Sequence, residues 1–327
     1  MSILHSFTRA MASLHPGRRA VRWIIDWDGT LTTRDTLDAL VRIAASTKPD
    51  SHVLQQWERV TQAYVGDYEV TLKSQTPDGK LPDTIAQEAR LLTVLRDVEE
   101  RSINRVSESG IFSGLTGSQL DSGAANAINT GQVQLRDGCC EFLKYVRRHD
   151  VGMLNILSVN WSRQFIAACL NATEPGLAEL FKNHIYANEL QGIKNGKPST
   201  GRIGEDGDLR LISSHDKVTC QQQLRTSNSE RESAIPVVYI GDSWTDFECL
   251  LEADLGICIR DDPMTSTQKK LGDSLRRLGV RCPHIQDWRE VDKWGVVWVK
   301  SFGEIERWQK ESKMAMAKFA HGSISIT

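Results

Sequence analysis

The chain of 327 residues is long enough to bury a large hydrophobic core, as one α/β domain or as a core with a smaller companion. Its formal net charge of -2 provides no overall positive field that would attract nucleic acid or an anionic membrane. The mean hydropathy is -0.36, and no apolar run approaches the roughly 20 residues of a membrane-spanning helix. The composition therefore predicts a soluble protein with neither nucleic acid nor membrane as a partner.

Seven cysteines are scattered along the chain without a C-x-x-C pair. This pattern is typical of free thiols in a reducing compartment, so we predict a cytoplasmic protein. Residues 1–25 contain several arginines and no acid, a composition that mitochondrial targeting sequences share, and a mitochondrial location is the alternative. We expect residues 1–20 to form a flexible leader.

The first predicted element is a buried strand over 21–25, which ends in Asp26-Trp27-Asp28-Gly29-Thr30. From 37 to 131 the apolar residues repeat at helical spacing, and no segment alternates as a strand does. We predict helices over 37–46, from 53 onward, from 85 onward, over 98–106 and over 118–128. The segment 37–131 is therefore expected to be an all-helical cap.

Beyond residue 132 the pattern changes, because apolar runs of strand length alternate with helical segments. We predict strands at 151–157, 184–187, 237–240, 255–259, 280–282 and 296–299, a hairpin-like stretch over 192–203, and a helix from Lys217 with Asp216 as its cap. Recurrent β-α units predict an α/β fold, a doubly wound and mostly parallel sheet. Its core would comprise 21–36 and 132–300, with a C-terminal helix and tail over 301–327.

Asp26 and Asp28 follow the first predicted strand, at the edge of a parallel sheet where ligands usually bind. Two carboxylates this close repel each other, so their proximity indicates either a bound divalent cation or two different catalytic roles. In the second case one carboxylate would act as the nucleophile and the other would transfer protons. An Asp-rich turn with no catalytic role is the alternative for this stretch taken alone.

Three further polar residues lie at predicted strand or helix ends. Ser158 and Asn160 come between an apolar strand and a helix, so a hydroxyl and free backbone amides could meet a phosphate there. Lys217 occupies a first helical turn, where the helix dipole disfavours a cation unless an anion holds it. A simple helix cap and a solvated lysine are the alternatives.

The strand 237–240 runs into Gly241-Asp242, and Asp246 lies four residues later at the start of a helix. Carboxylate oxygens in this arrangement suit Mg²⁺, which takes few protein ligands and keeps several waters. A turn residue followed by a helix cap is the alternative.

Taken in order, Asp26-Trp27-Asp28-Gly29-Thr30, Ser158, Lys217 and Gly241-Asp242 with Asp246 resemble the four motifs of the haloacid dehalogenase-like hydrolase superfamily over about residues 21–260. The stretch 185–190 looks like the phosphoserine phosphatase-like branch, which carries a helical cap between its first two motifs. The stretch 241–254 is similar to fungal and plant phosphatases of the thiamine monophosphate type. Trp27 replaces the more usual Phe, and Ser-Val-Asn-Trp replaces the common Ser-x-Gly.

The resemblance implies a Mg²⁺-dependent phosphatase that hydrolyses a small-molecule phosphate monoester, with thiamine monophosphate as one candidate. Asp26 would be the nucleophile, and Asp28 would be the general acid and base. Asp26, Asp242 and the main-chain oxygen of Asp28 would bind Mg²⁺, supported by Asp246.

By the same resemblance, Ser158, Asn160 and Lys217 would bind the phosphate. A phosphotransferase or phosphonate hydrolase could use the same groups. A catalytically inactive relative that acts as an interaction module is the alternative from a different class.

Overall fold

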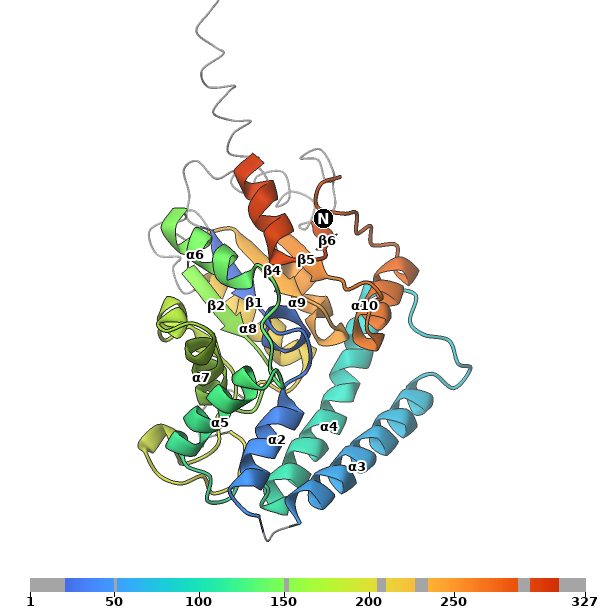
Figure 1. Ribbon diagram of the computed structural model, residues 1–327. Helices are drawn as coiled ribbons and strands as arrows, with labels where there is room; N and C mark the ends of the chain where they lie inside the picture. Colours follow the sequence, from blue (N-terminus) through green and yellow to red (C-terminus); the bar gives the residue numbers. More distant parts are fainter. Residues whose placement is uncertain are drawn as a thin grey trace, which may run out of the picture.

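A parallel sheet lies at the centre of the computed structural model, which describes residues 21–49, 52–149, 153–204, 210–226, 235–287 and 295–311 (Figure 1). The sheet has six strands in the order β3-β2-β1-β4-β5-β6, and each neighbouring pair is parallel. The strands are β1 (Arg22–Ile25), β2 (Met153–Leu157), β3 (Ile185–Tyr186), β4 (Val237–Gly241), β5 (Leu255–Ile259) and β6 (Val296–Val299). The predicted doubly wound α/β fold is confirmed.

The strand order reverses on either side of β1, whose neighbours are β2 and β4. Such a reversal leaves a crevice at the carboxyl ends of the central strands, because the chain departs in opposite directions from this point. The acidic residues of the first motif, Asp26 and Asp28, therefore lie where a doubly wound sheet usually binds its ligands.

The helices occupy both faces of the sheet and one end of it. They are α2 (Leu37–Ser46), α3 (Val53–Gln75), α4 (Ile85–Ser109), α5 (Gly117–Asn129), α6 (Cys139–His149), α7 (Arg163–Thr173), α8 (Ser214–Thr226), α9 (Phe247–Glu252) and α10 (Ser266–Arg277). Within 37–49 and 52–131 the structure contains α2 to α5 and no strand, and these helices lie below the sheet in Figure 1. The assignment of 37–131 to a separate cap remains a prediction.

Two hydrophobic clusters explain why the central strands contain so few polar residues. Trp23 and Ile25 of β1 belong to one cluster, whereas Ile24 belongs to the other, on the opposite face. Successive side chains of a strand point to opposite faces, so a sheet covered on both sides needs apolar residues at most positions of its central strands. None of the described helices is both long and apolar enough to cross a membrane.

Several predicted boundaries are wrong. Helix α4 is continuous from Ile85 to Ser109, so the separate helix over 98–106 does not exist. The segment 280–282 is no strand, and a single bridge between His284 and Trp298 is the pairing that forms nearby. The stretch 192–203 forms a 3-10 turn and one antiparallel bridge instead of a hairpin.

Helix α8 begins at Ser214 and not at Lys217. Ser213 precedes it and accepts a hydrogen bond from the Asp216 backbone, while the Asp216 carboxylate accepts from the Ser213 hydroxyl, so Ser213 and not Asp216 caps the helix. The C-terminal helix begins at 302, and its predicted continuation beyond 311 lies outside the described residues, as does the leader 1–20.

Candidate active site

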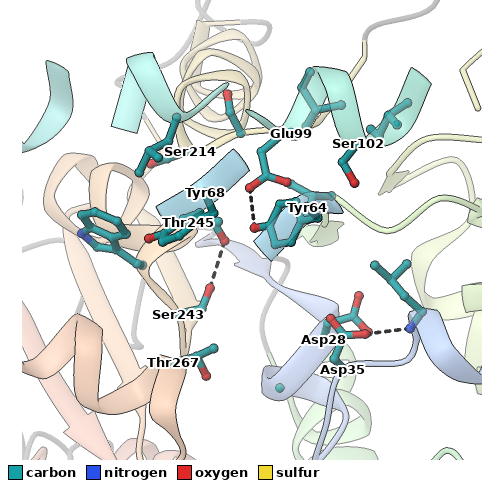
Figure 2. A pocket seen from close by; sticks show the side chains of 18 of the residues that line it. Asp28, Asp35, Tyr64, Tyr68, Glu99, Ser102, Ser214, Ser243, Thr245 and Thr267 are labelled. Carbon is teal, nitrogen blue, oxygen red and sulfur yellow. Dashed lines mark hydrogen bonds between the residues drawn. The ribbon is translucent and has the colours of Figure 1, made fainter. Parts of the chain in front are cut away.

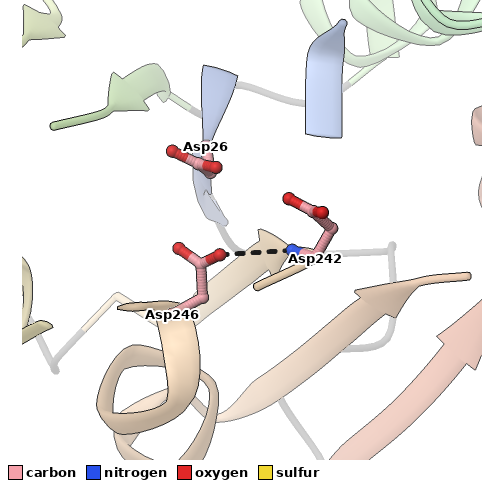
Figure 3. A group of neighbouring side chains, drawn as sticks. All are labelled: Asp26, Asp242 and Asp246. Carbon is pink, nitrogen blue, oxygen red and sulfur yellow. Dashed lines mark hydrogen bonds between the residues drawn. The ribbon is translucent and has the colours of Figure 1, made fainter. Parts of the chain in front are cut away.

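Two adjacent strands bring three carboxylates together. Ile25 of β1 pairs with Ile240 of β4, and the Asp26 amide donates to the Ile240 carbonyl at 2.9 Å, so Asp26 and Asp242 leave the sheet side by side. One oxygen from each of Asp26, Asp242 and Asp246 lies within 4.8 Å of the others, and all three residues are buried (Figure 3). The residues of the first and fourth sequence motifs thus share one site.

Lys217 lies among these carboxylates and is itself 1% exposed. Its Nζ donates to Oδ1 of Asp26 and to Oδ1 of Asp246, each at 2.7 Å. Burial raises the pKa of Asp26 well above its usual value, and the Lys217 charge opposes that shift. Burial also acts on Asp246, but there the Lys217 charge and its hydrogen bond prevail, so the pKa of Asp246 is lowered. The lysine therefore keeps part of this acidic cluster ionised.

Asp246 is a support for the site, since donors occupy both of its oxygens. Its Oδ1 accepts from Lys217 and from the hydroxyl of Tyr239 at 2.7 Å. Its Oδ2 accepts from the amides of Asp242 at 3.2 Å and Ser243 at 3.0 Å, and from the Ser243 hydroxyl at 2.9 Å. These bonds fix the turn that presents Asp242, and they leave Asp246 little capacity to bind a metal directly.

Asp26 and Asp242 have the free oxygen capacity that a hard divalent cation requires. Oδ1 of Asp242 accepts one hydrogen bond from Thr30, at 3.1 Å. Burial and the negative charge of Asp246 raise the pKa of Asp242 to about 7. A bound Mg²⁺ would relieve this repulsion, and carboxylates are the ligands it prefers, so the residues fit the predicted ion.

Gly29 leaves space for Asp242. Its φ is +75°, and a β-carbon at this position would lie 2.6 Å from Oδ2 of Asp242. Both the backbone conformation and the close approach require glycine here. Arg136 stabilises the Gly29-Thr30 turn, because its guanidinium donates to the Gly29 carbonyl at 2.8 Å and to the Thr30 carbonyl at 3.1 Å.

Asp28 lies outside the trio, at the N-terminus of α2. Its Oδ1 accepts from the Thr36 amide at 2.7 Å and the Thr36 hydroxyl at 2.6 Å, and its Oδ2 accepts from the side-chain amide of Asn160 at 2.9 Å. Burial raises the pKa of Asp28, and these hydrogen bonds oppose the shift. The carboxylate is thus half-buried and oriented by donors from Thr36, which precedes α2, and from Asn160 in the loop after β2.

Ser158 and Asn160 are both fully buried beside β1. The hydroxyl of Ser158 accepts from the Asn160 amide at 3.1 Å, and α7 begins later and is capped by Ser162, so Ser158 is not the cap of that helix. The side-chain amide of Asn160 is directed to Asp28. That Ser158 and Asn160 bind phosphate remains a prediction.

Asn188 is a supporting residue that the sequence patterns did not indicate. Its buried side-chain amide donates to the carbonyls of Asn160 at 3.2 Å and Leu211 at 2.7 Å, and its carbonyl accepts from the Leu211 amide at 3.0 Å. Asn188 thereby connects two segments: the loop after β2, whose Asn160 orients Asp28, and the segment that precedes α8. Helix α8 carries Lys217. No charge or spacing distinguishes such an asparagine in a sequence.

A cavity of about 530 Å³ opens onto the site, and Asp26, Asp28, Lys217 and Asp242 line it. Residues of the helical insert, of nearby loops and of α10 line its remaining walls, and Figure 2 shows part of them. They include Trp57, Tyr64, Tyr68, Glu99, Trp161, Trp244 and Lys270. The carboxylates therefore face a space large enough for a small organic molecule.

The doubly wound sheet with a helical segment after its first strand, and the acidic site at β1 and β4, have the arrangement that the resemblance to haloacid dehalogenase-like hydrolases predicted. The chain is 31% identical over 244 residues to a CTO1 family protein of Schizosaccharomyces pombe, covering 73% of this chain and 82% of that protein. The chain belongs to the CTO1 family. No protein-family model matches the chain.

Two other curated proteins are similar. Cold tolerance protein 1 of Saccharomyces cerevisiae is 25% identical over 298 residues, which cover 85% of this chain and 89% of that protein. The bifunctional TH2 protein, mitochondrial, of Arabidopsis thaliana is 27% identical over 321 residues, 92% of this chain but 46% of that protein.

Among solved structures, a substrate-bound phosphoserine phosphatase matches with a TM-score of 0.48 and 15% identity, covering 89% of this chain and 99% of that one. A phosphoserine phosphohydrolase-like protein of Francisella tularensis matches with a TM-score of 0.49 and 13% identity, covering 88% of this chain and 98% of that one.

Proposed function

We propose that the chain is a Mg²⁺-dependent phosphatase that hydrolyses a small-molecule phosphate monoester through an aspartyl-phosphate. One observation carries this proposal: a buried carboxylate, Asp26, contacts the ammonium group of Lys217 and has an oxygen within 4.8 Å of one from Asp242, at the wall of a cavity. A carboxylate in such a place can act as a nucleophile if positive charge screens it from the incoming phosphate.

In this mechanism an oxygen of Asp26 attacks phosphorus and the ester oxygen leaves. Asp28 gives its proton to the leaving alcohol and then takes one from the water that cleaves the aspartyl-phosphate, so the proton balance closes over the two steps. Burial favours the protonated form of Asp28, which suits the first step. Thr36 and Asn160 orient the carboxylate for this role.

The oxygens of Asp26, Asp242 and the Asp28 main chain would hold Mg²⁺, and Asp246 would support them. The ion supplies positive charge that lets an anionic nucleophile meet an anionic phosphate. Lys217 screens Asp26 and would bind a phosphate oxygen, with Ser158 and Asn160 as further proposed ligands of the phosphate.

The aromatic and acidic part of the cavity lining supports a flat leaving group that carries positive charge. Trp57 and Trp161 meet edge to face with ring centroids 5.8 Å apart, and both line the cavity. Glu99 adds a carboxylate, held by the Tyr64 hydroxyl at 2.8 Å (Figure 2). Aromatic faces with a nearby carboxylate bind cationic rings, so thiamine monophosphate is the substrate that we propose to test first.

The test is phosphate release from thiamine monophosphate, phosphoserine, pyridoxal phosphate, nucleotides and an aryl phosphate, each with and without MgCl₂. The proposal expects turnover that requires the metal and differs among these esters. Transfer to an added alcohol without matching phosphate release would identify a phosphotransferase. No turnover of any ester would favour the interaction module.

A further inference from the structure

Glu88 is a buried carboxylate that ties the helical insert to the rest of the molecule. It lies in the first turn of α4 and is 0% exposed. Its Oε1 accepts from Nε1 of Trp244 at 2.8 Å, and both of its oxygens accept from Nη2 of Arg277, each at 2.9 Å. Its partners follow β4 and lie in α10, 156 and 189 residues away along the chain.

This arrangement is a costly way to attach one helix to another. The free-energy cost of removing a carboxylate from water is offset only if well-placed donors bind it. An apolar contact of similar size often stabilises the fold as much or more. What the charged group adds is a fixed direction, because the indole N–H and the guanidinium must both point at it. Glu88 therefore sets the position of Trp244 as well as the contact between helices.

Trp244 lies close to the candidate active site. It follows Asp242 by two residues, within the turn that Asp246 fixes, and it lines the cavity. The Nζ of Lys270 lies 3.8 Å from the centroid of its ring and 4.4 Å from that of Tyr68, which belongs to α3 of the insert. The insert thus meets this tryptophan a second time, through Lys270.

The chemistry of Trp244 indicates which part of a substrate it contacts. Its one hydrogen-bond donor is used on Glu88, so the indole, which Lys270 also contacts, has no polar group left to offer the cavity and can present only ring surface. Such a surface cannot bind phosphate oxygens, but it can pack against the organic group that leaves. Phosphate would be bound at Asp26 and Lys217.

We propose that Glu88 is a positioning residue, and that the Trp244 ring it holds is a wall of the subsite for the leaving group. The inference rests on the proposed function, because it takes the cavity as the substrate site. In this proposal Glu88 of the insert and Trp244, beside the proposed metal-binding turn, act together on substrate binding.

The test compares Trp244→Phe, which removes the indole N–H and keeps an aromatic ring, with Glu88→Gln, which removes the charge and keeps the length. The control is Asp67→Asn, which removes the ion pairs of Asp67 with Arg101 and Arg105 inside the insert, at a residue that does not line the cavity. The measurements are KM and kcat for 4-nitrophenyl phosphate, the inhibition constant of inorganic phosphate, and the thermal midpoint.

The inference expects both test variants to raise KM by about tenfold while the inhibition constant of inorganic phosphate, which has no leaving group, stays within about twofold of wild type. The control should lower the thermal midpoint without changing KM. Unchanged KM in both test variants, or a parallel rise in KM and the inhibition constant, would overturn the inference alone. A wild-type protein that hydrolyses no phosphate ester would overturn the proposed function and this inference together.

Discussion

The ammonium nitrogen of Lys217 lies 2.7 Å from a carboxylate oxygen of Asp26, and both side chains are almost inaccessible to solvent. Their residues are 191 positions apart in the chain, so the fold brings together two groups that neither helix nor strand spacing relates. We therefore expect the stability of the site, and its proposed reactivity, to depend on this pair.

Replacement of Lys217 by Met should destabilise the fold by roughly 3 kcal/mol or more, because it leaves buried carboxylates without their counter-charge. Urea denaturation measures this loss. Adding Asp26→Asn to the Lys217→Met variant should recover part of it, since one of the uncompensated charges is then removed. Equal stability of Lys217→Met and wild type would show that the ammonium group does not balance these carboxylates.

Replacement of Gly29 by Ala should destabilise the protein and weaken Mg²⁺ binding, because a β-carbon there would overlap Asp242. Gly79→Ala is a matched control, since Gly79 has a φ of +68° and no atom within 4 Å of an added β-carbon. In each variant the left-handed backbone should lower the free energy of unfolding by about 1–2 kcal/mol. Any additional loss in Gly29→Ala measures the overlap with Asp242. Calorimetric Mg²⁺ titration and urea denaturation measure the two effects, and identical results for both variants would contradict the geometry.

Glu99 should make stability depend on pH. Burial raises the pKa of Glu99 from 4.5 to about 7, so between these values the folded state holds a proton that the unfolded state has lost. Stability relative to Glu99→Gln should therefore be greatest below pH 4.5, fall as the pH rises to about 7, and change little above that.

Tyr64→Phe sharpens the Glu99 prediction, because the Tyr64 hydroxyl bonds to the Glu99 carboxylate and opposes the upward shift of its pKa. Without that hydroxyl the fall in stability should extend to higher pH. Denaturation midpoints across this range measure both effects, and a constant difference between wild type and Glu99→Gln would disprove the assignment.

The meeting of Asp26 and Asp242 could be predicted because each follows a largely apolar segment, and the carboxyl ends of parallel strands share one edge. The alternation of strands and helices likewise predicted the sheet. The prediction of a strand over 280–282 was wrong. A Val and a Cys after a helix have the composition of a strand, but this segment pairs with no strand of the described sheet.

The contacts of Asp28 could not be predicted, because they depend on how the turn after β1 returns the chain to Thr36 and on where the loop after β2 places Asn160. Asn188 and Glu88 were missed for a similar reason. Their partners are backbone groups or side chains more than 20 residues away, and no periodicity in the sequence records such contacts.

The most direct test of the central claim is phosphate release from an aryl phosphate by wild type, Asp26→Asn and the control Asp273→Asn, whose carboxylate is exposed and paired with Arg276. With MgCl₂ present, wild type and Asp273→Asn should release phosphate, whereas Asp26→Asn should remain folded and lose at least about 1,000-fold in kcat, as expected when a nucleophile is removed. Release should stop in all three when EDTA replaces the metal. Full activity of a folded Asp26→Asn variant would contradict the account.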